Sequence, residues 1–205
     1  GMDPTMIRMS TLWGGTHREN DRDGFGRYGY GLPSACVSQG EKYTVYSQTE
    51  DSELHSLTID IKEIGEGKYS DTHGRVVAPE PKEDHLPGWV QKYIDTHLPN
   101  RKHGTVVLIE RLDRIDFSTR DGLERHLMEN FGVAYQNYLV NTPIYVHGQK
   151  VDPIDPLFIT PGFRFHEIPG NPIASEALEP MEIKVKSLKD EKVVGTVTVR
   201  FSYLP

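Results

Sequence analysis

Four glycines fall within one run of eight residues, and their spacing is the clearest chemical signal in the sequence. The run, residues 24–31, reads Gly-Phe-Gly-Arg-Tyr-Gly-Tyr-Gly, which places its glycines at Gly24, Gly26, Gly29 and Gly31. Glycine lets the backbone approach a polyphosphate closely and turn its N–H groups inward, and a helix beginning near Pro33 would add the favourable end of its dipole. The run therefore indicates a loop that folds over phosphates. The alternative is a turn that only joins two elements, because short glycine motifs also occur by chance.

The run also contains one cationic side chain, that of Arg27, and two tyrosines. Arg27 is placed either to pair with a phosphate oxygen or to lie in solvent. Tyr28 and Tyr30 interleave with the glycines, and we interpret them as packing groups that hold the loop.

Two other nucleotide-binding motifs share glycine strings of this kind, and their context is missing here. A dinucleotide-binding fingerprint needs an apolar strand directly before its first glycine, whereas residues 19–23 are polar and charged. A protein-kinase glycine loop lies between two strands, whereas Pro33 and a predicted helix follow this run. A Ser-His-Asp hydrolase is not supported either, because no nucleophile elbow is present.

The elements that would position the loop can be predicted from hydrophobic periodicity. Helical spacing predicts helices at residues 2–12, 89–98 and 120–140. Alternation and β-branched residues predict strands at residues 42–47, 54–64, 104–110 and 144–147, the last turning at Gly148, and a hairpin formed by residues 183–186 and 194–202.

This order of elements predicts an α+β fold. We expect a two-layer sandwich in which a mixed, mostly antiparallel sheet is covered on one face by helices. After Pro156 the composition shifts toward proline and glycine, which predicts a boundary between a domain of residues 1–155 and a second unit of residues 156–205 that opens with the hairpin.

Composition limits the partners and the compartment. The single cysteine, Cys36, excludes an intrachain disulfide and favours a cytoplasmic protein, and no apolar run approaches the length of a membrane span. The formal net charge of -7 argues against direct nucleic-acid binding by this segment. The nine histidines are scattered, so no metal site is predicted.

Three motifs together resemble the GHKL superfamily, which comprises gyrase, heat-shock chaperone, histidine kinase and MutL ATPases. Gly1-Met2 resembles the end of the DxGxGM box, and residues 24–31 resemble the glycine-rich lid. Residues 103–107, His-Gly-Thr-Val-Val, resemble the GTxV strand, and residues 144–151 resemble a later segment of MORC-type and MutL-type members. The resemblance covers residues 1–155, and the last fifty residues look like the opening of a transducer domain.

The resemblance implies an ATP-binding domain of the Bergerat type, incomplete in this chain, with ATP and Mg²⁺ as cofactors of the complete parent. It implies that Thr105 lies beside the nucleotide and that Met2 lines the adenine pocket, a core position being the alternative for Met2. The family's glutamate base, magnesium-binding asparagine and adenine-reading aspartate would all precede Gly1, so no catalytic residue or metal ligand is carried over.

From this we expect a fragment that binds nucleotide weakly, does not hydrolyse it, and self-associates through uncovered apolar sheet surface. A non-catalytic binding or scaffold protein that retains the fold is the alternative function.

Overall fold

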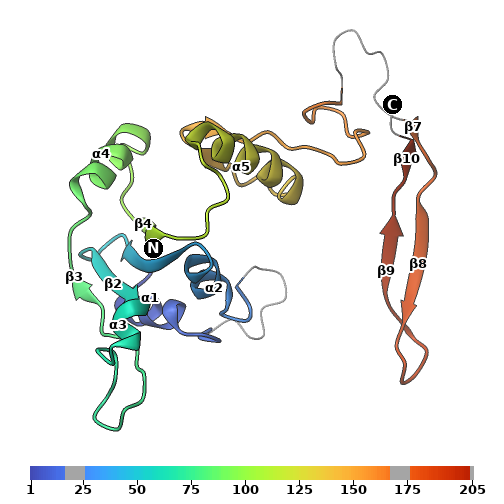
Figure 1. Ribbon diagram of the computed structural model, residues 1–205. Helices are drawn as coiled ribbons and strands as arrows, with labels where there is room; N and C mark the ends of the chain where they lie inside the picture. The colour runs from blue at the N-terminus through green and yellow to red at the C-terminus, as the bar shows by residue number, and fades with distance from the viewer. Residues whose placement is uncertain (17–25, 167–175, 204–205) are drawn as a thin grey trace. The chain divides into compact units, whose positions relative to one another are not determined.

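The computed structural model describes residues 1–16, 26–166 and 176–203, and it divides the chain into two compact units, Gly1–Asp116 and Phe117–Pro205. Each unit is described by itself. Figure 1 shows the helices and strands of both.

The first unit is built on a four-stranded antiparallel sheet with the strand order β3-β2-β1-β4. Its strands are β1 (Gly40–Gln48), β2 (His55–Asp60), β3 (Lys82–Glu83) and β4 (Gly104–Leu112). Strand β1 pairs with β2 on one edge and with β4 on the other, so that Val45 faces Leu57 and Val107. The expected α+β architecture is confirmed, and every pairing in this sheet is antiparallel.

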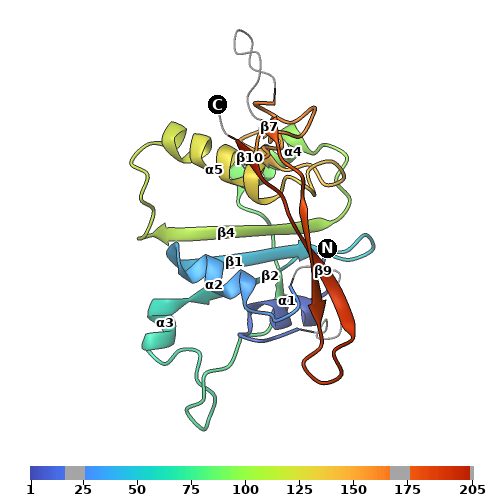
Figure 2. The same cartoon turned by 90° about the vertical axis from the view of Figure 1, so that its right-hand side faces the viewer.

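Helices α1 (Pro4–Thr11) and α2 (Gly31–Val37) cover one face of the sheet (Figure 2). Asp3 caps α1 by accepting a hydrogen bond of 2.8 Å from the amide of Met6, and Pro4 suits the first helical position. Ile7 of α1 is fully buried against Tyr43, Val45 and other apolar side chains of β1 and β2. This cluster fixes α1 and α2 on the sheet.

Helix α4 (Gly88–His97) covers the opposite face, which the sequence analysis did not anticipate because it expected helices on one face only. Val90 and Ile94, one helical turn apart, pack against Tyr46 and Leu86. The alternation of β1 therefore serves two cores, with Tyr43 and Val45 on one side and Tyr46 on the other.

Residues 61–65 form helix α3 (Ile61–Gly65), whereas the sequence pattern predicted a strand as far as Ile64. Asp60 explains the difference, because its carboxylate accepts hydrogen bonds from the amides of Lys62 and Glu63 and so starts a helix. The same carboxylate lies 2.6 Å from the guanidinium of Arg111 on β4. That hydrogen bond, followed by the two backbone amides, lowers the pKa of Asp60 despite its burial.

The second unit contains helix α5 (Arg120–Ala134), which is capped by Thr119 and is shorter than the predicted helix of residues 120–140. Leu127 and Phe131 of α5 pack against a small core around Val151. Strands β5 (Tyr145–Val146) and β6 (Gln149–Lys150) form a hairpin whose two turn residues, His147 and Gly148, both have positive φ, as a type I′ turn requires.

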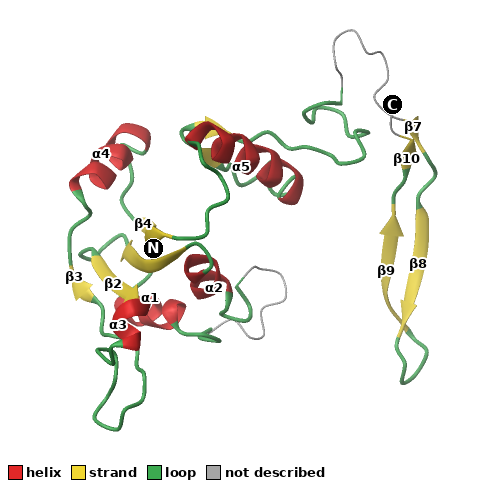
Figure 3. Cartoon of the chain, viewed as in Figure 1, coloured by secondary structure: helices red, strands yellow, loops and turns green. Residues whose placement is uncertain are grey.

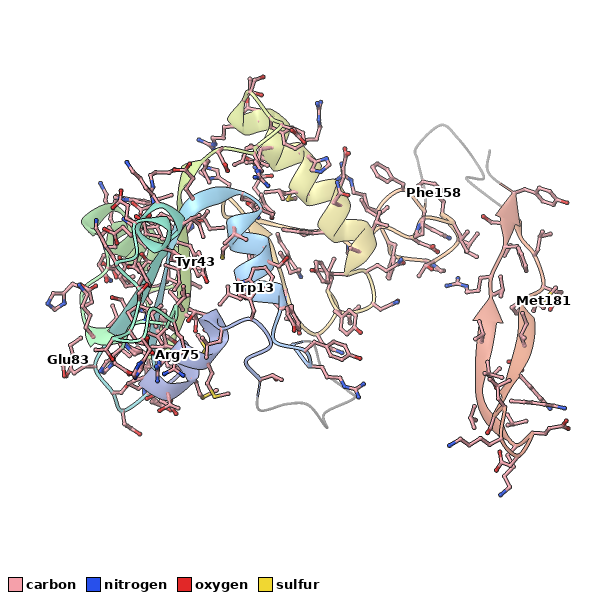
Figure 4. All side chains as sticks on the ribbon, turned by 60° about the horizontal axis from the view of Figure 1, so that its bottom comes forward. Trp13, Tyr43, Arg75, Glu83, Phe158 and Met181 are labelled. Atoms are coloured by element: carbon pink, nitrogen blue, oxygen red, sulfur yellow. The ribbon has the colours of Figure 1, made fainter. Side chains whose placement is uncertain are left out.

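Strands β8 (Met181–Lys186) and β9 (Val193–Val199) form the hairpin predicted near the carboxyl end (Figure 3). Short strands β7 (Glu176–Ala177) and β10 (Ser202–Tyr203) pair beside it. Met181, labelled in Figure 4, shares an exposed apolar face with Ile183 and Val185.

The domain boundary predicted after residue 155 falls within this second unit. None of the helices in the described ranges has the length and apolar character needed to cross a membrane.

Replacing Asp60 with asparagine should lower the midpoint of thermal unfolding by roughly 4 °C or more at neutral pH, because the charge partner of Arg111 is lost. Since the pKa of Asp60 is lowered by folding, its contribution is present above the unfolded value of about 3.9 and is lost as the pH falls through the folded pKa. The gap between the two proteins should therefore close below about pH 4. Thermal melts from pH 3 to pH 7 measure this gap. The control is Asp113→Asn, which removes the carboxylate of an exposed ion pair with Arg114. A gap that is constant with pH would contradict the account.

Candidate functional site

A cavity of about 190 Å³ lies between α1 and the glycine run. Most of its lining consists of three methionines, one leucine and four glycines: Met2, Met6, Met9, Leu32, Gly15, Gly26, Gly29 and Gly31. The remaining lining residues are Ser10 and Thr16. The cavity therefore joins an apolar, sulfur-rich wall to exposed backbone.

The glycines of this cavity have different structural roles. Gly29 has φ of +65°, and a Cβ placed there would lie 2.4 Å from the carbonyl oxygen of Gly15. The carbonyl of Gly29 accepts a hydrogen bond of 3.2 Å from the amide of Gly14, so Gly29 closes the base of the loop by backbone contact. Gly31 has no atom within 4 Å of its Cβ position and no positive φ. The space beside Gly31 is therefore open, whereas Gly29 is required by packing.

Gly26 is the third glycine of the run that the structure describes. It has φ of +86° and open space around its Cβ position, and its carbonyl accepts a hydrogen bond of 3.3 Å from the hydroxyl of Thr16. Gly24, the first predicted phosphate-binding glycine, lies outside the described residues.

Arg27 lines a neighbouring hollow of about 250 Å³ instead of the cavity itself. Its guanidinium lies 5.3 Å from the centre of the Tyr28 ring, a distance at which cation and ring attract each other. Tyr30 packs near Trp13, with 6.0 Å between ring centres, and Trp13 is labelled in Figure 4. Thr16 lines both the cavity and the hollow, so Arg27 lies next to the predicted phosphate region.

Thr105 does not line the cavity with the glycines but is linked to it by hydrogen bonds. The hydroxyl of Ser47 accepts a hydrogen bond of 2.7 Å from the amide of Met2 and lies 2.8 Å from the hydroxyl of Thr105. It also lies 3.1 Å from the carbonyl oxygen of Gly104. Ser47 is fully buried, so these contacts satisfy its hydroxyl without solvent.

The sequence analysis missed Ser47 and two of the methionines. Met2, Met6 and Met9 have the i, i+4, i+7 spacing of one helical face, which the sequence analysis used only to predict a helix at residues 2–12. Ser47 carries a weaker signal, because it lies on the inward face of β1 directly opposite Thr105 in the register. That pairing becomes visible only once the strands are aligned.

The chemistry available in the cavity comes from backbone and neutral side chains. No lining residue is ionisable, and helix α2 has only seven residues, so its dipole adds less than the sequence analysis expected. Cys36, on the buried face of α2, has its pKa raised by burial and is a packing group. In the part of the chain that the structure describes, no group of three or more His, Cys, Asp or Glu side chains is arranged to hold a metal ion.

A comparison with protein families identifies this region. The family described as "Histidine kinase-, DNA gyrase B-, and HSP90-like ATPase" matches residues 1–105, just over half of the 205 residues. The match contains the glycine run and both cavity-lining segments, and it ends at Thr105. No curated protein matches the chain.

Gly29 and Gly31 should respond differently to substitution by alanine. Gly29→Ala should lower the free energy of unfolding by about 1–3 kcal/mol, because it forces a side chain into a left-handed backbone and against Gly15. Gly31→Ala should change it by no more than about 0.5 kcal/mol. Urea unfolding of both variants measures this, and equal stability of the two would show that the loop does not close through Gly29.

Proposed function

The chain belongs to the histidine kinase-, DNA gyrase B- and HSP90-like ATPase family, and from this we propose that the cavity beside α1 is where it binds ATP. In this proposal the methionine wall contacts the adenine base and the backbone of residues 26–31 surrounds the phosphates. The observation that carries it is that one cavity within the family match joins Met2 to three of the predicted phosphate-binding glycines.

The lining fits the two ends of a nucleotide. Methionine sulfur makes favourable contacts with aromatic rings, which suits the methionine wall to a purine. At the other end, no atom lies near the position that a Cβ of Gly31 would take, so a phosphate could approach the backbone there. A side chain at this position would block that approach. Met2 thus contributes to the proposed base site while also packing against the core of the sheet.

Thr105 is proposed to act at the base end through Ser47. The hydrogen bonds from the Met2 amide to Ser47 and between Ser47 and Thr105 hold the segment that lines the cavity. Arg27 lines the neighbouring hollow, which shares Thr16 with the cavity, and is proposed to pair with a terminal phosphate, whose charge no lining side chain offsets.

We further propose that these 205 residues bind nucleotide weakly and do not hydrolyse it. The cavity volume of about 190 Å³ is below the roughly 300–1,000 Å³ of typical ligand sites, so it encloses only part of a nucleotide. The lining has no carboxylate to act as a general base, a contribution typically worth about 10²–10⁴ in rate. The lining has no carboxylate to hold Mg²⁺ either, so a magnesium ion would be held by the phosphates of the nucleotide and would there supply the charge compensation that the neutral lining lacks.

A non-catalytic scaffold is the second candidate function, and one observation favours it. Gly29 is explained fully by its contact with Gly15, without any ligand. A glycine run retained only for such packing would serve as a turn.

Calorimetric titration with a non-hydrolysable ATP analogue and Mg²⁺ tests the proposal. We expect weak saturable binding, and Gly31→Ala should weaken it about fivefold or more, because the added methyl group occupies the phosphate side of the cavity. Gly65→Ala is the matched control, because Gly65 also has open space around its Cβ position and lies outside the cavity. Phosphate release from ATP should stay at background.

Two results would contradict the proposal in different ways. Absence of saturable binding up to millimolar nucleotide would favour the scaffold function. Binding that Gly31→Ala and Gly65→Ala leave equally unchanged would show that nucleotide binds elsewhere on the chain.

A further inference from the structure

A second cavity, of about 590 Å³, lies where α4 ends and β4 begins. Its volume is in the range of small-molecule sites. Ile94, Leu98, Pro99 and Val106 give it apolar walls, and the imidazoles of His97 and His103 lie at its lining. No residue is shared between this lining and that of the proposed ATP cavity, and a link between them is Thr105, which lines the second cavity and contacts Ser47.

Arg101 is the unusual member of the second cavity. Its Nη1 atom is buried and has no hydrogen-bond partner among the described residues, and its guanidinium forms no ion pair with them. A buried donor without a partner costs stability, and a charged one costs more. Since Nη1 is itself enclosed by protein atoms, a ligand in the cavity would pair with the other nitrogens of this guanidinium.

The surroundings of Arg101 favour an anion with a single charge. No aspartate or glutamate lines the cavity, and Arg101 is its only permanently charged side chain. The adjacent Lys102 points its ammonium toward Glu50, at 3.8 Å, and is not part of the lining. The carboxyl end of α4 would oppose an anion, but the carbonyls of Ile94 and Leu98 already accept hydrogen bonds from the amides of Leu98 and Arg101.

We propose that this cavity binds an apolar molecule that carries one carboxylate, with the guanidinium of Arg101 as its anchor. A guanidinium donates two parallel hydrogen bonds to a carboxylate, and here its nitrogens other than the enclosed Nη1 would make them. The apolar walls would take the body of the ligand. A phosphate dianion fits less well, because the lining offers only one permanent positive charge. The carboxylate belongs either to a free organic acid or to the carboxyl terminus of an apolar peptide.

The test uses 4-phenylbutyrate as probe on the 205-residue chain, followed by ligand-observed NMR and calorimetry. Arg101→Leu should weaken binding about tenfold or more, and Lys102→Leu, the same loss of charge one residue away, should change it less than about twofold. Arg101→Lys keeps the positive charge without the planar guanidinium, so its affinity for the probe should lie between those of the wild type and Arg101→Leu. Thermal unfolding of Arg101→Leu should begin no earlier than that of the wild type, because an unpaired buried donor is removed.

Further arms distinguish the source of the carboxylate. An apolar peptide that binds only with a free carboxyl terminus, and loses binding when amidated, would assign the site to chain ends. Equal binding of the amidated peptide, tighter binding of inorganic phosphate than of the probe, or unchanged probe binding in Arg101→Leu would overturn the proposal. So would an earlier unfolding of both Arg101→Leu and Arg101→Lys, which would give Arg101 a structural role. A failed ATP titration would leave this proposal standing, since the two linings are separate.

Discussion

One buried hydroxyl group, that of Ser47, holds together three segments on which the proposed ATP site depends: the chain at Met2, strand β1 and the start of β4. It accepts a hydrogen bond from the amide of Met2 and contacts the hydroxyl of Thr105 near the start of β4, and no solvent reaches it. The partly buried amide of Met2 pairs with Ser47, which places Met2 on the sheet, and α1 comes directly after it in the chain. The methionine side of α1 therefore meets the glycine run, and the cavity between them results from that placement.

The glycine run combines two requirements that are often treated as one. Gly29 is needed because its backbone touches Gly15, and the resulting closure brings the loop back to the end of α1. Gly31 has no such constraint, and its lack of a side chain leaves the cavity open. Gly29, which needs close packing, and Gly31, which leaves open space, thus lie two residues apart. Substitution of Gly29 changes the stability of the loop, so it cannot report on ligand binding alone.

Much of the fold could be predicted from local pattern, and the exceptions have local causes. The alternation of β1 and β4 and the helical spacing of α4 are strong, because β1 and α4 have buried residues and β4 has partly buried ones that pack on both cores. The strand predicted over residues 61–64 was wrong because a capping carboxylate, Asp60, competes with the strand pattern. The site was predicted less completely. Gly26, Gly29, Gly31 and Met2 meet in one cavity, but Arg27 and Thr105 lie beside it, and Ser47 is identified only by strand register.

Photo-crosslinking with an azido-adenine derivative of ATP tests the central claim, nucleotide binding at the methionine wall, most directly. The label should be found by peptide mass spectrometry in the segment that contains Met2, Met6 and Met9, and excess ATP should prevent it. Label confined to peptides outside the cavity, or label that ATP does not displace, would contradict the account.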